Sequence, residues 1–224
     1  MEKTLVRTEN IQIANGGPNL TGDLTIPEEA HGIVVFAHGS GSSRFSVRNR
    51  CVAESLQESG LATLLIDLLT PDEELQDQVS GHLRFDIAML AGRLVDATQW
   101  LAGDSRVARL PVGYFGASTG AGAALVAATR CPRRVAAVVS RGGRPDLAGL
   151  ALPKVKAATL LIVGGDDMPV IQLNQQALTK LGSVTKQLVL VPGATHLFAE
   201  RGALEHVTQL AADWFEQHLF DGEQ

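Results

Sequence analysis

From about residue 31 onward, short apolar runs alternate with longer segments whose apolar residues recur at helical spacing. Short apolar runs bounded by turn residues suit the strands of a parallel sheet that is buried on both faces. Helical segments between such strands predict right-handed crossovers and therefore a doubly wound α/β fold. The predicted strands are 33–37, 62–66, 112–115, 136–139, 159–163 and 187–191, and the predicted helices are 47–59, 85–101, 121–128, 170–181 and 204–219.

The chain before residue 31 follows a different pattern. Two segments of alternating apolar and polar residues, 5–14 and 19–26, flank the turn sequence Gly16-Gly17-Pro18. This arrangement predicts an antiparallel hairpin. The whole chain, 1–224, is therefore expected to form one α/β domain: a mostly parallel sheet that begins with a hairpin.

Composition narrows the class of protein. The 224 residues carry a net charge of −5 with a pI near 5.7, which argues against a nucleic-acid partner. No apolar run is long enough to span a membrane, and the first residues lack the apolar core of a signal peptide, so we expect a cytoplasmic protein without a membrane partner. Cys51 and Cys131 lack metal-ligand spacing and are expected to be small core residues of helices in a reducing compartment.

The most informative segment is Gly116-Ala117-Ser118-Thr119-Gly120, which lies between a predicted strand and a predicted helix of small residues. A serine between two glycines on such a turn is the nucleophile-elbow pattern. The turn is so sharp that side chains two positions from Ser118 would collide with neighbouring backbone, and glycine removes the collision. The alternative interpretation is a glycine-rich turn in which Ser118 only caps the helix.

Other reactive side chains also follow predicted strands. They include Asp166 and Asp167 after the strand 159–163, and His196 after the strand 187–191. The carboxyl ends of parallel strands share one edge of the sheet, where such folds place their sites. The chain order of serine, aspartate and histidine is the order that the elbow requires. We predict that Ser118 is the nucleophile and that His196 is its base, because imidazole can take up and return a proton near neutral pH.

With these motifs, the chain resembles the dienelactone-hydrolase-like group of α/β-hydrolases from the His38-Gly39 loop to the His196 loop. Dienelactone hydrolases carry cysteine at the elbow, so Ser118 favours a general serine esterase. The resemblance implies that the acid is Asp167, with Asp166 capping the next helix or facing solvent. An oxyanion hole needs two backbone N–H donors, and Thr119, directly after the nucleophile, should supply one of them. The other should come from the loop His38-Gly39-Ser40, where the resemblance favours Ser40.

Arginines near the sheet edge could select the substrate. Arg44 and Arg141 are candidates to bind a substrate carboxylate through a guanidinium fork, as in dienelactone hydrolases. The alternative is local pairing of Arg44, Arg48, Arg141 and Arg144 with Asp146, Glu73 or Glu74. The segment 141–153 is too short for a separate cap domain, which predicts an open site that accepts small substrates.

The resulting hypothesis is a serine hydrolase for small carboxylic esters that works through an acyl-enzyme, without a cofactor or a metal, as a monomer or a homodimer. The same triad also serves lactone, thioester and amide cleavage, which the sequence does not separate. A non-catalytic binding protein would be expected to lack a triad residue. A nucleotide-binding protein would be expected to carry a phosphate-binding motif, and neither a P-loop nor a dinucleotide fingerprint is present.

Overall fold

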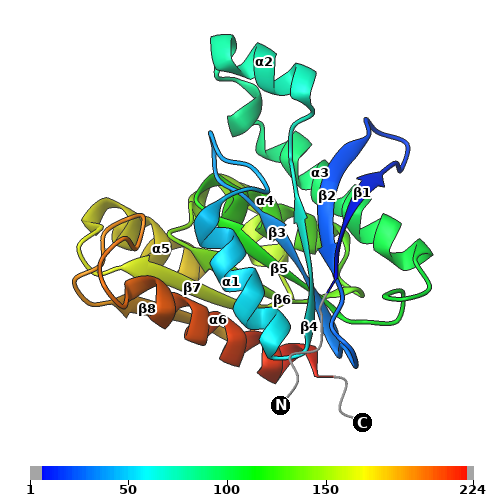
Figure 1. Ribbon diagram of the computed structural model, residues 1–224. Coiled ribbons are helices and arrows are strands. Elements are labelled where there is room, and N and C mark those ends of the chain that lie inside the picture. Colours follow the sequence, from blue (N-terminus) through cyan, green and yellow to red (C-terminus); the bar gives the residue numbers. More distant parts are fainter. Residues whose placement is uncertain (1–6, 221–224) are drawn as a thin grey trace.

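The structure, a computed structural model, describes residues 7–220 as an eight-stranded sheet with helices on both faces (Figure 1). The strand order is β1-β2-β4-β3-β5-β6-β7-β8, as expected for a doubly wound sheet that begins with a hairpin. β2 pairs antiparallel with both β1 and β4. The six strands β4, β3, β5, β6, β7 and β8 are parallel to one another. The strands are β1 (Thr8–Ile13), β2 (Leu20–Thr25), β3 (Gly32–Ala37), β4 (Leu61–Ile66), β5 (Val112–Ala117), β6 (Val135–Arg141), β7 (Ala158–Gly164) and β8 (Lys186–Val191).

The predicted strands agree with the observed strands to within a few residues, apart from the start of the first, where Leu5 and Val6 lie outside the described residues. The prediction that all the later runs are buried on both faces is wrong for β8. Five of its six residues are exposed or half-buried, because β8 is the edge strand and has a neighbour on one side only.

The helices cover the two faces of the sheet unequally. α1 and α6 pack on one face, and α3, α4 and α5 pack on the other. The helices are α1 (Val47–Glu58), α2 (Pro71–Ser80), α3 (Ile87–Gly103), α4 (Thr119–Arg130), α5 (Met168–Lys180) and α6 (Ala203–Leu219), with 3-10 segments η1 (Leu83–Phe85) and η2 (Pro145–Lys154).

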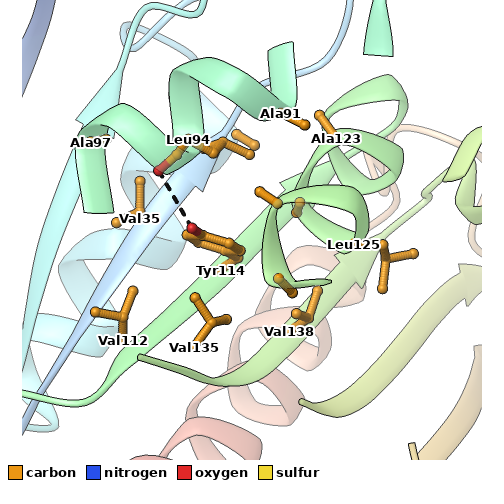
Figure 2. Close-up of a cluster of buried hydrophobic side chains, with 14 of the residues drawn as sticks. Val35, Ala91, Leu94, Ala97, Val112, Tyr114, Ala123, Leu125, Val135 and Val138 are labelled. Atoms are coloured by element: carbon orange, nitrogen blue, oxygen red, sulfur yellow. Dashed lines mark hydrogen bonds between the residues drawn. The ribbon is translucent and has the colours of Figure 1, made fainter. Parts of the chain in front are cut away.

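The core beneath α3 and α4 surrounds Tyr114 of β5 (Figure 2). Its ring is fully buried, and its hydroxyl lies 2.5 Å from Thr98 Oγ1 and donates to the carbonyl of Leu94 at 3.4 Å. Burial raises the pKa of Tyr114, so the phenol stays neutral. α4 lies close to the sheet because its sequence is rich in alanine and glycine.

α2 is a helix that apolar periodicity did not predict. It stands away from the sheet (Figure 1), and its apolar residues Leu75 and Val79 are exposed. Its start is specified locally: Thr70 and Glu73 form a capping box, and Pro71 occupies the first turn. That sequence signal could have revealed the helix.

The cysteine prediction is only partly correct. Cys131 is half-buried and packs against the core, whereas Cys51 is exposed on α1, so its description as a core residue is wrong. The residues of α1 that face the core include the next two, Val52 and Ala53, and Cys51 lies outside this buried face. No helix in residues 7–220 has the length and apolar character needed to cross a membrane.

Candidate active site

Ser118 occupies the sharp turn between β5 and α4. Its backbone has φ 50° and ψ −120°, in the positive-φ region that side chains other than glycine rarely adopt. Neighbouring main chain fixes this conformation. The Ser118 N–H donates to the Arg141 carbonyl at 3.3 Å, and the Ser118 carbonyl accepts from Ala121 N at 3.1 Å and Arg144 N at 3.0 Å. The turn is therefore a strained elbow, as the sequence predicted.

The glycines on both sides of Ser118 are required by close main-chain contacts. A Cβ at Gly116 would lie 2.4 Å from Ala121 Cα, and a Cβ at Gly120 would lie 2.3 Å from the Ala37 carbonyl oxygen. Both distances are far shorter than a van der Waals contact. The predicted collision two residues from the serine is thus confirmed on both sides of the elbow.

The predicted acid and base are hydrogen-bonded to each other. His196 Nδ1 lies 2.7 Å from Asp167 Oδ2, and the side chains are 41% and 12% exposed, respectively. Their loops meet because the Asp166 N–H donates to the Ala194 carbonyl at 3.0 Å and Gly164 lets the chains approach. Asp166 itself is exposed, in agreement with its expected position facing solvent.

The imidazole of His196 lies beside the backbone that supports the elbow. A Cβ at Gly142 would be 3.6 Å from His196 Cε1, and Gly142 directly follows Arg141, whose carbonyl accepts the Ser118 N–H. Within residues 7–220, Ser118 Oγ and His196 make no hydrogen bond with each other. Such contacts are often long in enzymes before substrate binds, and they tighten in the reactive complex.

Ser40 and Thr119 are also brought together. The Ser40 N–H donates to Thr119 Oγ1 at 2.9 Å, so this hydroxyl fixes the loop after β3 against the start of α4. Gly39 allows the close approach, since a Cβ there would lie 3.1 Å from Ser118 Cβ. The Thr119 N–H is in the first turn of α4, where backbone donors have no partner within the helix.

His38 precedes this loop and is buried. Its Nε2 accepts the Leu68 N–H at 3.0 Å, and its Nδ1 lies 2.9 Å from the Gly39 carbonyl. This pattern requires a neutral ring with the proton on Nδ1. Burial lowers the pKa of His38, although the Gly39 carbonyl and the charges of Asp67 and Glu74 oppose the shift. His38 therefore joins the ends of β3 and β4 as a neutral structural residue.

The arginines near the site have different partners. The guanidinium of Arg44 pairs with Asp67 and, at 3.4 Å, with Asp23, while Arg144 pairs with Asp146 at 2.7 Å. Pairing of Arg144 with Asp146 was among the expected alternatives, but the two partners of Arg44 were not. Arg141 is 7% exposed and has no ion pair within residues 7–220.

A cavity of about 600 Å³ lies next to the site, between the loop after β3 and the segment after β4. Its wall includes His38, Arg44, Ser46, Asp67 and Glu74 but neither Ser118 nor His196. The side chain of Asp167, which bonds His196, also lies outside this wall. The cavity is linked to Ser118 through the loop after β3: His38 lines the cavity, and a Cβ on the next residue, Gly39, would lie 3.1 Å from Ser118 Cβ.

Solved structures with similar folds agree with this architecture. The crystal structure of a dienelactone hydrolase from Anabaena variabilis superposes with a TM-score of 0.94 at 59% sequence identity, covering 96% of this chain and 100% of that chain. Est1E from Butyrivibrio proteoclasticus superposes with a TM-score of 0.77 at 16% identity, covering 93% of this chain and 98% of that chain. At that identity, Est1E is similar in fold alone.

Two curated proteins of Mycobacterium tuberculosis, each named "Putative phosphoribosyl transferase", are 59% identical over 214 residues. The match covers 96% of this chain but 47% of each relative, so the chain spans about half the length of these proteins. Their names describe proteins of twice the matched length. The sequence model of the dienelactone hydrolase family matches residues 20–219, and this chain therefore belongs to the dienelactone hydrolase family.

Proposed function

We propose that this chain is a serine hydrolase that cleaves small carboxylic esters through an acyl-enzyme intermediate. The observation that carries the proposal is the Asp167–His196 hydrogen bond on loops adjoining the strained elbow of Ser118. A hydroxyl is a weak nucleophile until a base takes its proton, and that base needs a third group to orient it. Membership of the dienelactone hydrolase family supports the same chemistry.

In the proposed reaction, Ser118 Oγ attacks the ester carbonyl carbon and passes its proton to His196 Nε2. Asp167 accepts the Nδ1–H bond, which orients the ring and stabilises its charged form. The Thr119 N–H donates a hydrogen bond to the oxyanion. The Ser40 N–H donates a second one, either in place of its bond to Thr119 Oγ1 or in addition to it. His196 then protonates the leaving alcohol. Water attacks the acyl carbon after giving a proton to His196, which releases the acid and restores Ser118.

Lactones are the second candidate substrates, because the family and the Anabaena variabilis relative are both named for dienelactone hydrolase. The steps are identical, except that the alcohol formed by ring opening stays attached to the acyl group. A panel of lactones and open-chain esters with matched acyl groups separates the two. Faster turnover of the lactones would favour this second candidate.

A fluorophosphonate probe tests the mechanism directly, because it modifies only an activated serine. We expect the label on the peptide that contains Ser118, and we expect Ser118→Ala to lose label and lower turnover by several orders of magnitude. Ser105→Ala, an exposed serine in a turn, is the matched control and should keep both. Esterase activity that survives in folded Ser118→Ala would refute the proposal.

A further inference from the structure

The cavity of about 600 Å³ lies between the loop after β3 and the start of α2, next to the expected oxyanion donors (Figure 1). A much smaller hollow adjoins it, and the walls of both include His38, Ser42 and Glu74. The wall of the smaller hollow also includes Ser40 and Thr119. Small-molecule sites usually have volumes of roughly 300–1,000 Å³. The larger cavity can therefore hold the part of an ester that extends beyond the scissile bond.

Hydroxyl groups in the cavity wall have hydrogen atoms available to a ligand. Ser43 Oγ, Ser46 Oγ and Thr70 Oγ1 each accept a main-chain N–H, and none of them donates to a partner within residues 7–220. The Ser42 hydroxyl, in the same wall, makes no hydrogen bond in that part of the chain. A hydroxyl offers one donor and two acceptor sites. Each of these four side chains can therefore donate to a ligand without giving up a bond that it already makes.

Glu74 adds a carboxylate acceptor to the wall. It lies in the first turn of α2 and is half-buried, and its side chain forms neither an ion pair nor a hydrogen bond with any other part of residues 7–220. The other carboxylate of the wall, Asp67, is already paired with Arg44. A carboxylate only accepts hydrogen bonds, so Glu74 is complemented by a ligand that donates them.

Phe45 gives the cavity an apolar surface. The residue is 54% exposed, and the guanidinium carbons of Arg44 and Arg50 lie 4.0 Å and 4.9 Å from the centroid of its ring. Such cation–π contacts restrain a ring that solvent alone would leave mobile. A restrained apolar ring beside hydrogen-bonding groups complements a ligand that carries both C–H and O–H groups.

These groups together suit a hydroxylated ligand better than an ion or a hydrocarbon. An anion cannot donate to Glu74 and is repelled by its charge, and an apolar group leaves the carboxylate and the hydroxyls without partners. An ammonium group can pair with Glu74, but it only donates and cannot accept from the hydroxyls. A polyol donates and accepts, so it can bond to both kinds of group.

We propose that this cavity binds the alcohol part of the substrate and that this part is a polyol, such as a monosaccharide. The inference rests on the proposed function and narrows its substrates to acyl esters of polyols. A compound with several hydroxyls forms an ester most simply through one of them, which makes it the alcohol rather than the acid. In the reaction, the bond from the carbonyl carbon to the polyol oxygen breaks, the acyl group stays on Ser118, and His196 protonates the polyol oxygen.

A matched pair of acetate esters tests the proposal. One is methyl glucoside acetylated at its primary hydroxyl, and the other is tetrahydropyranylmethyl acetate, which has the same ring without hydroxyls. We expect the wild type to have a kcat/KM for the sugar ester at least about tenfold above that for the other ester, because a site that bonds hydroxyls is left with unpaired groups when they are missing.

Substitutions in the wall locate the source of this preference. Glu74→Ala should lower it about tenfold and Ser42→Ala about threefold, since hydrogen bonds to charged groups are the stronger ones. Neither side chain has a partner to lose within residues 7–220, so fluorophosphonate labelling of Ser118 should stay within about twofold of the wild-type rate. Asp72→Ala removes another carboxylate of the same helical turn, outside the cavity wall, and should keep the preference.

Three results would overturn the inference and leave the proposed function standing, because labelling and ester turnover persist in each. The first is an equal kcat/KM for the two acetates in the wild type. The second is a sugar preference that survives in both Glu74→Ala and Ser42→Ala. The third is a larger preference for acetylcholine over its uncharged isostere, neohexyl acetate, that Glu74→Ala removes, which would show a cation site. Loss of label and of all ester turnover in the wild type would refute the proposed function itself.

Discussion

Replacement of Asp167 by asparagine tests the acid of the proposed triad, and the adjacent Asp166 provides a matched control. Asp167 Oδ2 lies 2.7 Å from His196 Nδ1, while Asp166 is exposed and its side chain makes no hydrogen bond within residues 7–220. Asp167→Asn keeps the size of the side chain but removes the charge that stabilises the imidazolium in the transition state.

The size of the effect follows from the geometry. Two unit charges about 4 Å apart attract by about 4 kcal/mol at an effective dielectric constant of 20. The His196 side chain is 41% exposed, so screening by solvent reduces the benefit to about 2–4 kcal/mol. At about 1.4 kcal/mol per factor of ten, kcat should fall about 30- to 1000-fold, and a wrong imidazole tautomer would add to the loss.

The assay is steady-state hydrolysis of a p-nitrophenyl ester near pH 7.5, with the rate of fluorophosphonate labelling as a second measurement. Asp166→Asn should stay within about twofold of the wild type, as expected for a surface substitution. Equal losses in the two variants, or a loss below about threefold in a folded Asp167→Asn protein, would contradict the assignment of Asp167.

Three further predictions concern stability. In urea, the free energy of unfolding of Ser118→Gly should be about 1 kcal/mol higher than that of Ser118→Ala, because φ 50° and ψ −120° suit glycine. Equal free energies of unfolding would argue against strain at the elbow. The pKa of His38 is lower in the folded protein than in the unfolded chain, so below about pH 6.5 the unfolded chain binds an extra proton. The free energy of unfolding should therefore fall on acidification, by at most about 1.4 kcal/mol per pH unit. His218 adds a slope of the same sign, so the test is whether His38→Gln unfolds with a shallower pH dependence than the wild type. Tyr114→Phe should lose about 1 kcal/mol of stability in thermal unfolding, and Thr98 keeps its bond to the Leu94 carbonyl in that variant.

The features that were predictable from sequence are those that local pattern specifies. The central strands are buried on both faces, so their apolar runs stand out, and the elbow needs its glycines for steric reasons that are visible in the sequence. Strand ends were less exact, because pairing with neighbours extends β5 and β6 by one or two residues beyond the apolar run. The pairing of His196 with Asp167 rather than Asp166 came from the family resemblance, and the hydrogen bond agrees with it.

Other features depend on contacts between distant segments. α2 buries little apolar surface and is fixed by its capping box and by the ion pair between Asp77 and Arg84, so helical periodicity gave no signal. Arg44 pairs with Asp23 and Asp67. In the sequence, β3 separates Asp23 from Arg44 and β4 separates Arg44 from Asp67. The two aspartates become neighbours only when β2 joins β4. Arg141 has no carboxylate partner among residues 7–220, and this was equally invisible in the sequence, because an absent contact can be recognised only when the surroundings are known.

Arg141 supports the elbow through its main chain, while its side chain makes separate contacts on the α1 side of the sheet. Its carbonyl accepts the N–H of Ser118. Three residues onward lies Arg144, whose N–H donates to the Ser118 carbonyl. The strained elbow is therefore fixed by main-chain bonds, which do not depend on the side chain at position 141. The guanidinium extends to the α1 side of the sheet and contacts Asn49. Replacement of the Arg141 side chain should therefore leave intact the main-chain bonds that hold Ser118, which lies at the end of the neighbouring strand.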